Sequence, residues 1–376
     1  MLKAFKIASI SILGILLFNS CKNDLKIIAP YKEIPQVHAI LTPQNPMQMI
    51  RINKIFLGEG NANDMALVPD SINYKAGELT VMLERFVNGS KVAAELSTGK
   101  TELYFRDSLI QTEPGAFSTT QRVYLCNDRL FSDGIYKLTI KNNHTNNVFT
   151  ATTTAIDSVR VTGLPPLAAP YYTFTPDPTD NQPYYYIDYR NQTGSNYIVR
   201  TKAANGGFLH DLTIRIHYYD SVPVSMATDG KIYQSLDFIF RPQQLYEQIN
   251  FNTSKYFNFS FKGSSLFAEC GNLLSKRKYP SGFIGRRVYR VDFVTYAATQ
   301  DYYDYLQFSA PSLSFAQEKI LYSNFDQRAA IGIFTFRTRC AVKKVPANVF
   351  VDEFSYNKFT CQYSFFTNSF SSIGCP

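Results

Sequence analysis

The sequence predicts a mainly β protein, with an N-terminal immunoglobulin-like β-sandwich followed by a larger β-rich domain that has a few short helices. The 376 residues include 26 Tyr and 30 Phe, and aromatic side chains favour strands. Apolar and polar residues alternate in many short segments, which is the period of a strand with one buried face. Turn signals such as Asn88-Gly89 and Asp133-Gly134 separate these segments.

The first 20 residues have the pattern of a secretion signal. A basic start is followed by the uncharged, mostly apolar segment 7–18, which is too short to span a bilayer. The segment leads to Ser20-Cys21, and this arrangement resembles the lipobox of bacterial lipoproteins. We expect residues 1–20 to be removed and Cys21 to carry a lipid anchor, in which each buried methylene contributes about 0.8 kcal/mol. The alternative is an ordinary secretion signal with an incidental cysteine.

The mature N-terminal part is expected to be a tether, 21–35, followed by the sandwich, 36–156. The tether is polar and irregular and contains two prolines. Strands are predicted at 36–41, 47–57, 78–86, 122–126, 135–141 and 147–154. The long segment 58–74 interrupts them, with one predicted helical turn at 63–67. We expect this segment to cap one end of the sandwich.

The second domain, 157–376, is also expected to be rich in strands. Strands are predicted at 212–218, 235–240, 257–262, 289–293 and 334–336. In 289–293, one predicted face holds Tyr289, Val291 and Phe293, and the other holds Arg290 and Asp292. Short helices are predicted at about 243–250, 264–274 and 301–308.

The charge of the chain is mildly basic, at a formal +8. Two clusters of basic residues occur, at 276–278 and at Arg286-Arg287 with Arg290. Such clusters can contact phosphate on lipopolysaccharide or nucleic acid, but we favour solvated loop flanks. No nucleic-acid partner is expected, because an exported protein rarely meets nucleic acid. No mature segment approaches 18 consecutive apolar residues, so we expect the chain to be water-soluble apart from its lipid.

No motif of a known catalytic or metal centre occurs in the sequence. The four histidines, His38, His144, His210 and His217, form no HExxH pattern. His210 and His217 are seven apart on one predicted strand segment and should therefore face opposite sides. No serine lies in a GxSxG elbow. We expect no enzyme activity, metal or cofactor, although a hydrolase whose carboxylates meet only in the fold stays an alternative.

Cysteine usage points to one disulfide. Five cysteines remain beside Cys21, namely Cys126, Cys270, Cys340, Cys361 and Cys375. An odd set cannot be fully paired within one chain. Cys126 and Cys270 have apolar neighbours and are predicted to be buried free thiols. One disulfide is predicted among the other three, and the Cys361–Cys375 choice would close a loop of about 15 residues.

Tyrosines gather in the sequence. They occur as Tyr171-Tyr172, Tyr184-Tyr185-Tyr186 with Tyr189, Tyr218-Tyr219, and Tyr302-Tyr303 with Tyr305. The apolar body and polar tip of tyrosine suit binding surfaces. On consecutive strand positions, however, one ring faces the core and the next faces out, and we favour this reading. The absence of Trp weakens the case for a glycan-binding module.

Two stretches resemble an uncharacterised family of Bacteroidota cell-envelope lipoproteins, whose members are often encoded near TonB-dependent outer-membrane receptors. The first is 39–43 continuing through 50–62, and the second is 321–324 leading to 331–334. Ala329-Ala330 departs from the glycine usual before the Gly-Ile-Phe segment. With the lipobox, the resemblance covers most of the mature chain. It implies an envelope location and a two-part β architecture, and it implies no catalytic residue.

These features lead us to expect an outer-membrane-anchored, non-enzymatic binding or accessory lipoprotein. Its expected partners are the membrane, through the lipid on Cys21, and a TonB-dependent receptor. Both the periplasmic and the surface-exposed side of the membrane fit. One alternative is an adhesin or fimbria-like subunit, which would need an exposed strand edge for assembly. The other is an envelope hydrolase.

Overall fold

The structure is a computed structural model. It describes residues 33–55, 62–112, 118–163, 196–240, 243–244, 256–309, 321–367, 369 and 375. Strands dominate these ranges and the helices are few and short, so the predicted mainly β class is confirmed. Residues 1–32, with Cys21 and most of the tether, lie outside the described ranges. The tyrosines at 171–172, 184–186 and 189 lie outside them as well.

The N-terminal part contains eight strands and two helices of about one turn. The strands are β1 (Pro35–Leu41), β2 (Gln48–Lys54), β3 (Leu79–Val87), β4 (Ser90–Val92), β5 (Glu102–Gln111), β6 (Thr120–Cys126), β7 (Ile135–Asn142) and β8 (Val148–Thr154). The helices are α2 (Ala62–Ala66) and α3 (Pro69–Ile72). All six strands predicted for this part are present, and β4 and β5 are additional.

The remaining elements follow in chain order. They are β9 (Arg160–Gly163), β10 (Asn196–Lys202), β11 (Leu209–Ser221), β12 (Lys231–Ile239), β13 (Gln243–Gln244), β14 (Tyr256–Lys262), α4 (Gly263–Ser275), β15 (Gly285–Ala298), α5 (Gln300–Ser309), η1 (Asp326–Arg328), β16 (Ile331–Lys344), α6 (Asn348–Tyr356) and η2 (Cys361–Tyr363). The predicted helices at 264–274 and 301–308 are confirmed as α4 and α5. The helix predicted at 243–250 is wrong at 243–244, which pair with β11 as a strand; the part at 245–250 lies outside the described residues.

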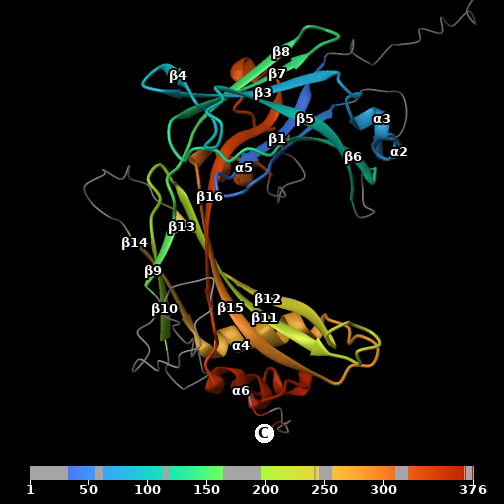
Figure 1. Cartoon of the computed structure of the whole chain (residues 1–376), viewed down its shortest axis with the longest axis vertical. Helices are drawn as coiled ribbons and strands as arrows, with labels where there is room; N and C mark the ends of the chain where they lie inside the picture. Colours follow the sequence, from blue (N-terminus) through green and yellow to red (C-terminus); the bar gives the residue numbers. More distant parts are fainter. Residues whose placement is uncertain are drawn as a thin grey trace, which may run out of the picture.

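In the described ranges, one hydrogen-bonded path of strands runs through both halves of the chain (Figure 1). Its order is β12-β11-β15-β16-β1-β2-β6-β5-β3-β7-β8, with β13 beside β11 and β4 beside β3. A separate sheet has the order β14-β10-β9. Strand β5 folds the path into a sandwich, because its first residues pair with β3 and its later residues pair with β6.

Strand β16 joins the two halves. Its residues 331–336 run parallel to β1, and its residues 337–344 run antiparallel to β15. The ranges 36–156 and 157–376 are therefore linked by one continuous strand. The core of the sandwich accordingly contains Phe334 and Phe336 beside residues of β1, β2, β3 and β5 to β8. The Phe336 ring lies 4.8 Å from the ring of Tyr136 on β7.

The two parts of the second stretch that carries the family resemblance, 321–324 and 331–334, meet at this strand. Gly332 donates its N–H to the carbonyl of Tyr322 at 2.8 Å. The Asn324 side chain donates to the carbonyl of Phe334 at 2.7 Å and accepts from its N–H at 3.0 Å. Asn324 thus satisfies the backbone of Phe334 on an edge of β16 that no strand of the described ranges pairs.

The segment after β2 closes the gap between β2 and β6. Asn73 forms an isolated bridge with Asn53 of β2. Its side chain accepts from the N–H of Arg122 at 2.9 Å and donates to the carbonyl of Thr120 at 3.1 Å, and both partners belong to β6. Ile72 and Tyr74 are buried beside it. The predicted helical turn at 63–67 is confirmed as α2.

The second half forms a helix-backed sheet, which we define as β12, β11, β15 and residues 337–344 of β16. Helix α4 has apolar residues at helical spacing, and Leu266, Phe267, Cys270 and Leu274 are buried. Phe267 contacts Phe350 and Phe354 of α6, with ring centroids 5.8 and 4.9 Å apart. Figure 1 shows α4 and α6 on the side of this sheet that faces away from the sandwich.

Candidate functional site

The face of the helix-backed sheet that is turned away from α4 and α6 is the candidate functional site, and we call it the open face. Strand β11 alternates strictly: Leu212, Ile214, Ile216 and Tyr218 are fully buried on the helix side. Arg215, His217 and Tyr219 point to the other side and are partly exposed. The predicted arrangement of Tyr218 in the core and Tyr219 facing out is therefore confirmed.

A β-bulge in β15 changes which residues reach the open face. His217 pairs with Arg290, but the next residue, Tyr218, pairs with Val288, so Tyr289 is an extra residue in β15. A bulge re-aims neighbouring side chains, and here Tyr289 and Arg290 both lie on the open face. The prediction that placed Tyr289 on the same face as Val291 and Phe293 is wrong for this reason, because those two are buried.

Three tyrosines form a cluster on this face, one from each neighbouring strand. The ring of Tyr233 lies 6.2 Å from that of Tyr219 and 5.6 Å from that of Tyr289, and Tyr219 and Tyr289 are 6.0 Å apart. Tyr233 is 55% exposed. Lys231 lies over the Tyr219 ring at 5.0 Å, and Arg290 lies over the Tyr289 ring at 5.9 Å. Aromatic surface and positive charge are therefore adjacent here.

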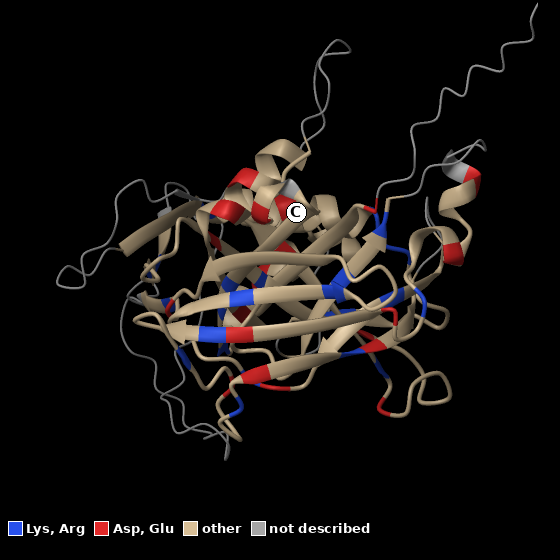
Figure 2. Ribbon diagram, turned by 90° about the horizontal axis from the view of Figure 1, so that it is seen from above, with Lys and Arg blue, Asp and Glu red and all other residues tan. Residues whose placement is uncertain are grey.

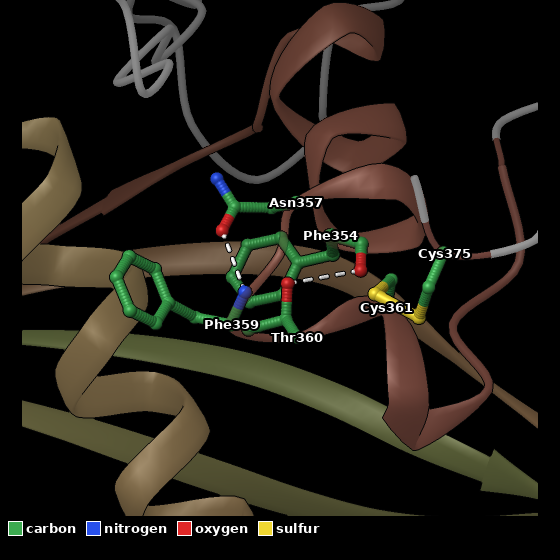
Figure 3. Close-up of a disulfide and its surroundings, with 6 residues drawn as sticks. All are labelled: Phe354, Asn357, Phe359, Thr360, Cys361 and Cys375. Carbon is green, nitrogen blue, oxygen red and sulfur yellow. Dashed lines mark hydrogen bonds between the residues drawn. A yellow bond between two sulfur atoms is a disulfide. The ribbon is translucent and has the colours of Figure 1, made fainter.

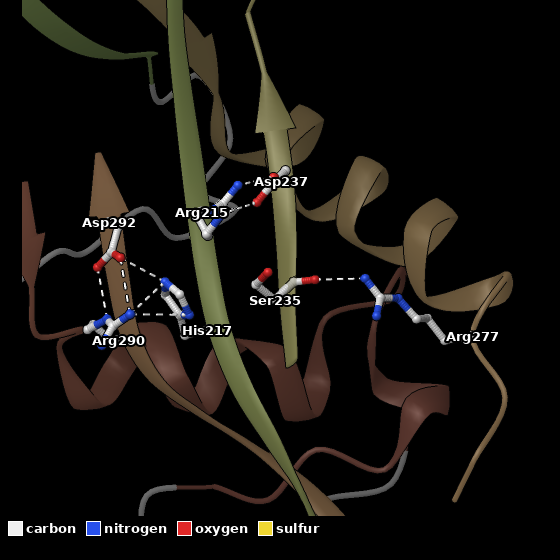
Figure 4. A network of polar contacts seen from close by, with 7 residues as sticks. All are labelled: Arg215, His217, Ser235, Asp237, Arg277, Arg290 and Asp292. Atoms are coloured by element: carbon white, nitrogen blue, oxygen red, sulfur yellow. Dashed lines mark hydrogen bonds and ion pairs between the residues drawn. The ribbon is translucent and has the colours of Figure 1, made fainter. Parts of the chain in front are cut away.

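Ion pairs hold the centre of the open face (Figure 4). Arg215 donates two hydrogen bonds of 2.7 Å to the carboxylate of Asp237. This bidentate geometry fixes both side chains across β11 and β12. On the other side, Asp292 accepts from Arg290 at 3.2 Å and lies 2.8 Å from the imidazole of His217. Burial works to raise the pKa of Asp292, but the hydrogen bond to His217 and the charge of Arg290 outweigh it and lower that pKa.

The His217–Asp292 pair has the form of a carboxylate-oriented histidine, so we compared it with a catalytic triad. Ser235 lies directly opposite His217 on β12. A nucleophile must be hydrogen-bonded to the free imidazole nitrogen. The Arg290 guanidinium instead lies 3.1 Å from Nε2 and 3.5 Å from Nδ1 of His217. The arrangement is therefore that of a charged network rather than of an activated serine.

The two basic clusters of the sequence lie in or beside the helix-backed sheet. Arg277 donates to the side chain of Gln234 and to the carbonyl of Ser235, both at 2.9 Å, and so covers part of the edge of β12. Arg286 is fully buried and donates to Asp220 at 2.7 Å, with both side chains at 0% exposure. The interpretation of this cluster as a solvated loop flank is wrong for Arg286, because its strand position faces the helix side.

The cysteines occupy three kinds of position. A disulfide joins Cys361 to Cys375 beside the end of α6, where Thr360 donates to the Phe354 carbonyl at 3.0 Å (Figure 3). Cys126 and Cys270 are buried free thiols, as predicted. Burial raises the pKa of both, to about 11 for Cys126. Both thiols are therefore protonated at neutral pH and poorly nucleophilic.

The other histidine of β11 has a structural role. His210 is fully buried on the helix side, opposite to His217 as predicted, and its ring stacks on Phe257 at 4.4 Å. Its Nε2 accepts the N–H of Ala204 at 3.1 Å. Burial lowers the pKa of His210 to about 4, so the ring is neutral at physiological pH.

Within the described ranges, no three His, Cys, Asp or Glu side chains gather closely enough to hold a metal ion. Among the helices of those ranges, none has the length and apolar character needed to cross a membrane. No model of a known protein family matches the chain, and no curated protein matches it in sequence.

Proposed function

We propose that this protein is a lipid-anchored, non-enzymatic binding or accessory protein of the bacterial outer membrane, with a TonB-dependent receptor as its partner. The observation that carries the proposal is the N-terminal sequence, in which a basic start and the apolar segment 7–18 lead directly to Ser20-Cys21. The resemblance of 39–62 and 321–334 to Bacteroidota envelope lipoproteins supports the same location.

The attachment of the tether to the sandwich suits such an anchor. Glu33 accepts hydrogen bonds from Asn142 at 2.6 Å, Asn147 at 2.7 Å and Thr145 at 2.8 Å. These residues lie at the turn between β7 and β8, so the chain enters the fold at that end of the sandwich. Residues 21–32 span at most roughly 40 Å between the lipid and Glu33. A protein held in this way stays near the membrane while its helix-backed sheet is offered to partners.

The open face supports a binding role over an enzymatic one. Its central charged side chains are held in ion pairs, and beside them Tyr233 is exposed while Tyr219 and Tyr289 are partly exposed. Exposed, rigid aromatic and Arg side chains are typical of recognition surfaces.

The adhesin alternative draws on edge strands, and β12 is one of them, because it lies at an end of the strand order in the described ranges. An unpaired edge can accept a strand from another subunit. Arg277 already occupies the Ser235 carbonyl on this edge, which disfavours strand addition at that point.

Metabolic labelling with palmitate tests the anchor. Wild type is expected to incorporate label and fractionate with membranes, whereas Cys21→Ala is expected to stay unlabelled. Cys340→Ala is the matched control, because Cys340 is a partly exposed free cysteine in the folded domain. If Cys21→Ala keeps its label and its membrane fraction, the anchor is wrong.

A pull-down from detergent-solubilised envelope tests the role. A stoichiometric receptor supports the accessory function, and self-polymers support the adhesin. Turnover of a polysaccharide or peptide that is lost on changing one carboxylate would replace the proposal with the hydrolase.

A further inference from the structure

We propose that the open face of the helix-backed sheet binds a polyanionic polysaccharide, a chain bearing carboxylate or sulfate groups. This inference deepens the proposed function by naming the ligand class of the binding surface. It rests on the placement of charge, on the tyrosine cluster and on the rigidity of the face.

Charge is distributed unequally across the helix-backed sheet. On the open face and the turn beside it, seven cations stand against four carboxylates. The cations are Arg215, Lys231, Arg287, Arg290, Arg337, Arg339 and Lys343, and the carboxylates are Asp211, Asp229, Asp237 and Asp292. The helices α4 and α6 on the opposite side contain acidic residues and no Lys or Arg. Figure 2 shows red segments on the helices and both blue and red segments on the strands. An anionic polymer is therefore drawn to the open face.

Two of these carboxylates are held by an arginine, since Arg215 binds Asp237 and Arg290 binds Asp292. The other two accept hydrogen bonds, Asp229 from the hydroxyl of Tyr233 at 2.7 Å and Asp211 from the N–H of Tyr296 at 3.1 Å. Of the other cations, Lys231 lies at one margin of the face, and Arg339 and Lys343 lie at the other margin, on β16.

The tyrosine cluster lies within these basic residues. Neighbouring strands are about 4.8 Å apart, so the four strands present a face roughly 15 Å wide. Tyr219, Tyr233 and Tyr289 offer apolar ring surface for the C–H faces of sugar rings, and their hydroxyl groups can bond sugar hydroxyls. Charge attraction supplies much of the binding to a polyanion, so the absence of Trp does not argue against it as it does for neutral glycans.

The extended arrangement of the cations favours a polysaccharide over a compact anion as the ligand. The cations are spread over four strands instead of converging on one point. A linear chain with repeated charges can contact several of them at once. A membrane headgroup surface is disfavoured, because Glu33 fixes the tether to the sandwich and not to the helix-backed sheet.

Binding to four defined polymers tests the proposal with the purified full chain. The probes are heparin, polygalacturonate, neutral dextran and duplex DNA, measured by calorimetry at low and high salt. We expect heparin or polygalacturonate to bind, with affinity falling at least tenfold between about 0.05 and 0.5 M salt as charges are screened. Dextran is expected to bind at least tenfold more weakly.

Two pairs of substitutions locate the site. Lys231→Gln with Tyr233→Ser removes one margin of the face, and Arg339→Gln with Lys343→Gln removes the other. Each pair is expected to weaken anionic polysaccharide binding at least tenfold. The matched control is Lys137→Gln with Tyr104→Ser on the sandwich, where Tyr104 is 60% exposed. It is expected to bind like wild type.

Several outcomes overturn the proposal. These are equal binding of dextran, equal or tighter binding of DNA, binding that survives both pairs of substitutions in folded protein, or no binding of either anionic polysaccharide. Unchanged unfolding midpoints verify that the variants fold. Palmitate labelling of Cys21 is a separate readout. If the protein is labelled but does not bind polyanions, the lipid anchor still stands and only this inference is wrong.

Discussion

Gly332 is the residue at which the joining strand β16 enters the sandwich, and its replacement by alanine is the sharpest test of this architecture. Its φ angle is +113°, a region that L-residues with a side chain rarely adopt. A Cβ atom at this position would lie 1.9 Å from the carbonyl oxygen of Val37 on β1 and 2.9 Å from the carbonyl carbon. Neither atom can yield, because both belong to the backbone of the paired strand.

The expected cost of Gly332→Ala has two parts. The unfavourable φ contributes about 1–3 kcal/mol. Relieving the overlap requires β1 and β16 to separate locally, which loses about two strand hydrogen bonds at roughly 1 kcal/mol each. We therefore expect the free energy of unfolding to fall by about 3–5 kcal/mol, a large part of the 5–15 kcal/mol typical of a folded protein.

Gly99→Ala is the matched control. Gly99 also has a positive φ, +71°, but nothing lies within 4 Å of the position its Cβ would take. Its replacement should cost only about 1–2 kcal/mol, the strain of the left-handed backbone alone. Urea unfolding followed by circular dichroism compares the two variants. The reasoning would be refuted if both variants lost the same free energy of unfolding, or if Gly332→Ala lost less than about 1 kcal/mol relative to wild type.

Three further predictions concern buried polar groups and the disulfide. Asn324→Ala should lower the free energy of unfolding by about 2–4 kcal/mol in urea titrations, because it leaves one N–H and one C=O of β16 without a partner; an effect below about 1 kcal/mol would contradict that role. Reduction should destabilise wild type by about 3 kcal/mol, as measured by unfolding with and without dithiothreitol, and should leave the Cys361→Ser/Cys375→Ser double variant unaffected. Burial lowers the pKa of His210 to about 4 and raises that of Asp211 to about 6. As the pH falls from 6.5 to 4, His210 therefore lowers the free energy of unfolding by about 3 kcal/mol, and Asp211 raises it by about as much. Asp211→Asn removes the second contribution, so the free energy of unfolding of this variant should fall by about 3 kcal/mol more than that of wild type over this range. An unchanged pH dependence in that variant would show that burial does not raise the pKa of Asp211.

The sequence by itself determined the class of the fold and most of its strands. Alternation of apolar and polar residues depends only on neighbours along the chain. It located β1, β7 and β11, and it identified the buried face of β7 and of β11. The same local reasoning identified α4 and placed Cys126 and Cys270 in the core. In these elements the buried side chains are apolar ones, so the identity of each residue is enough to predict its burial.

The tertiary structure decided how these strands are joined and which residues share a surface. Gln36 of β1 pairs with Ile331 of β16, and no local period specifies a partner so distant in the chain. The bulge that brings Tyr289 to the open face exists only because β15 and β11 differ in length by one residue at that point. Arg286 reads as a surface residue within a basic run, yet Asp220 on the adjacent strand makes its burial tolerable. Pairing, bulges and buried ion pairs are set by contacts between distant segments, and those contacts form only when the chain has folded.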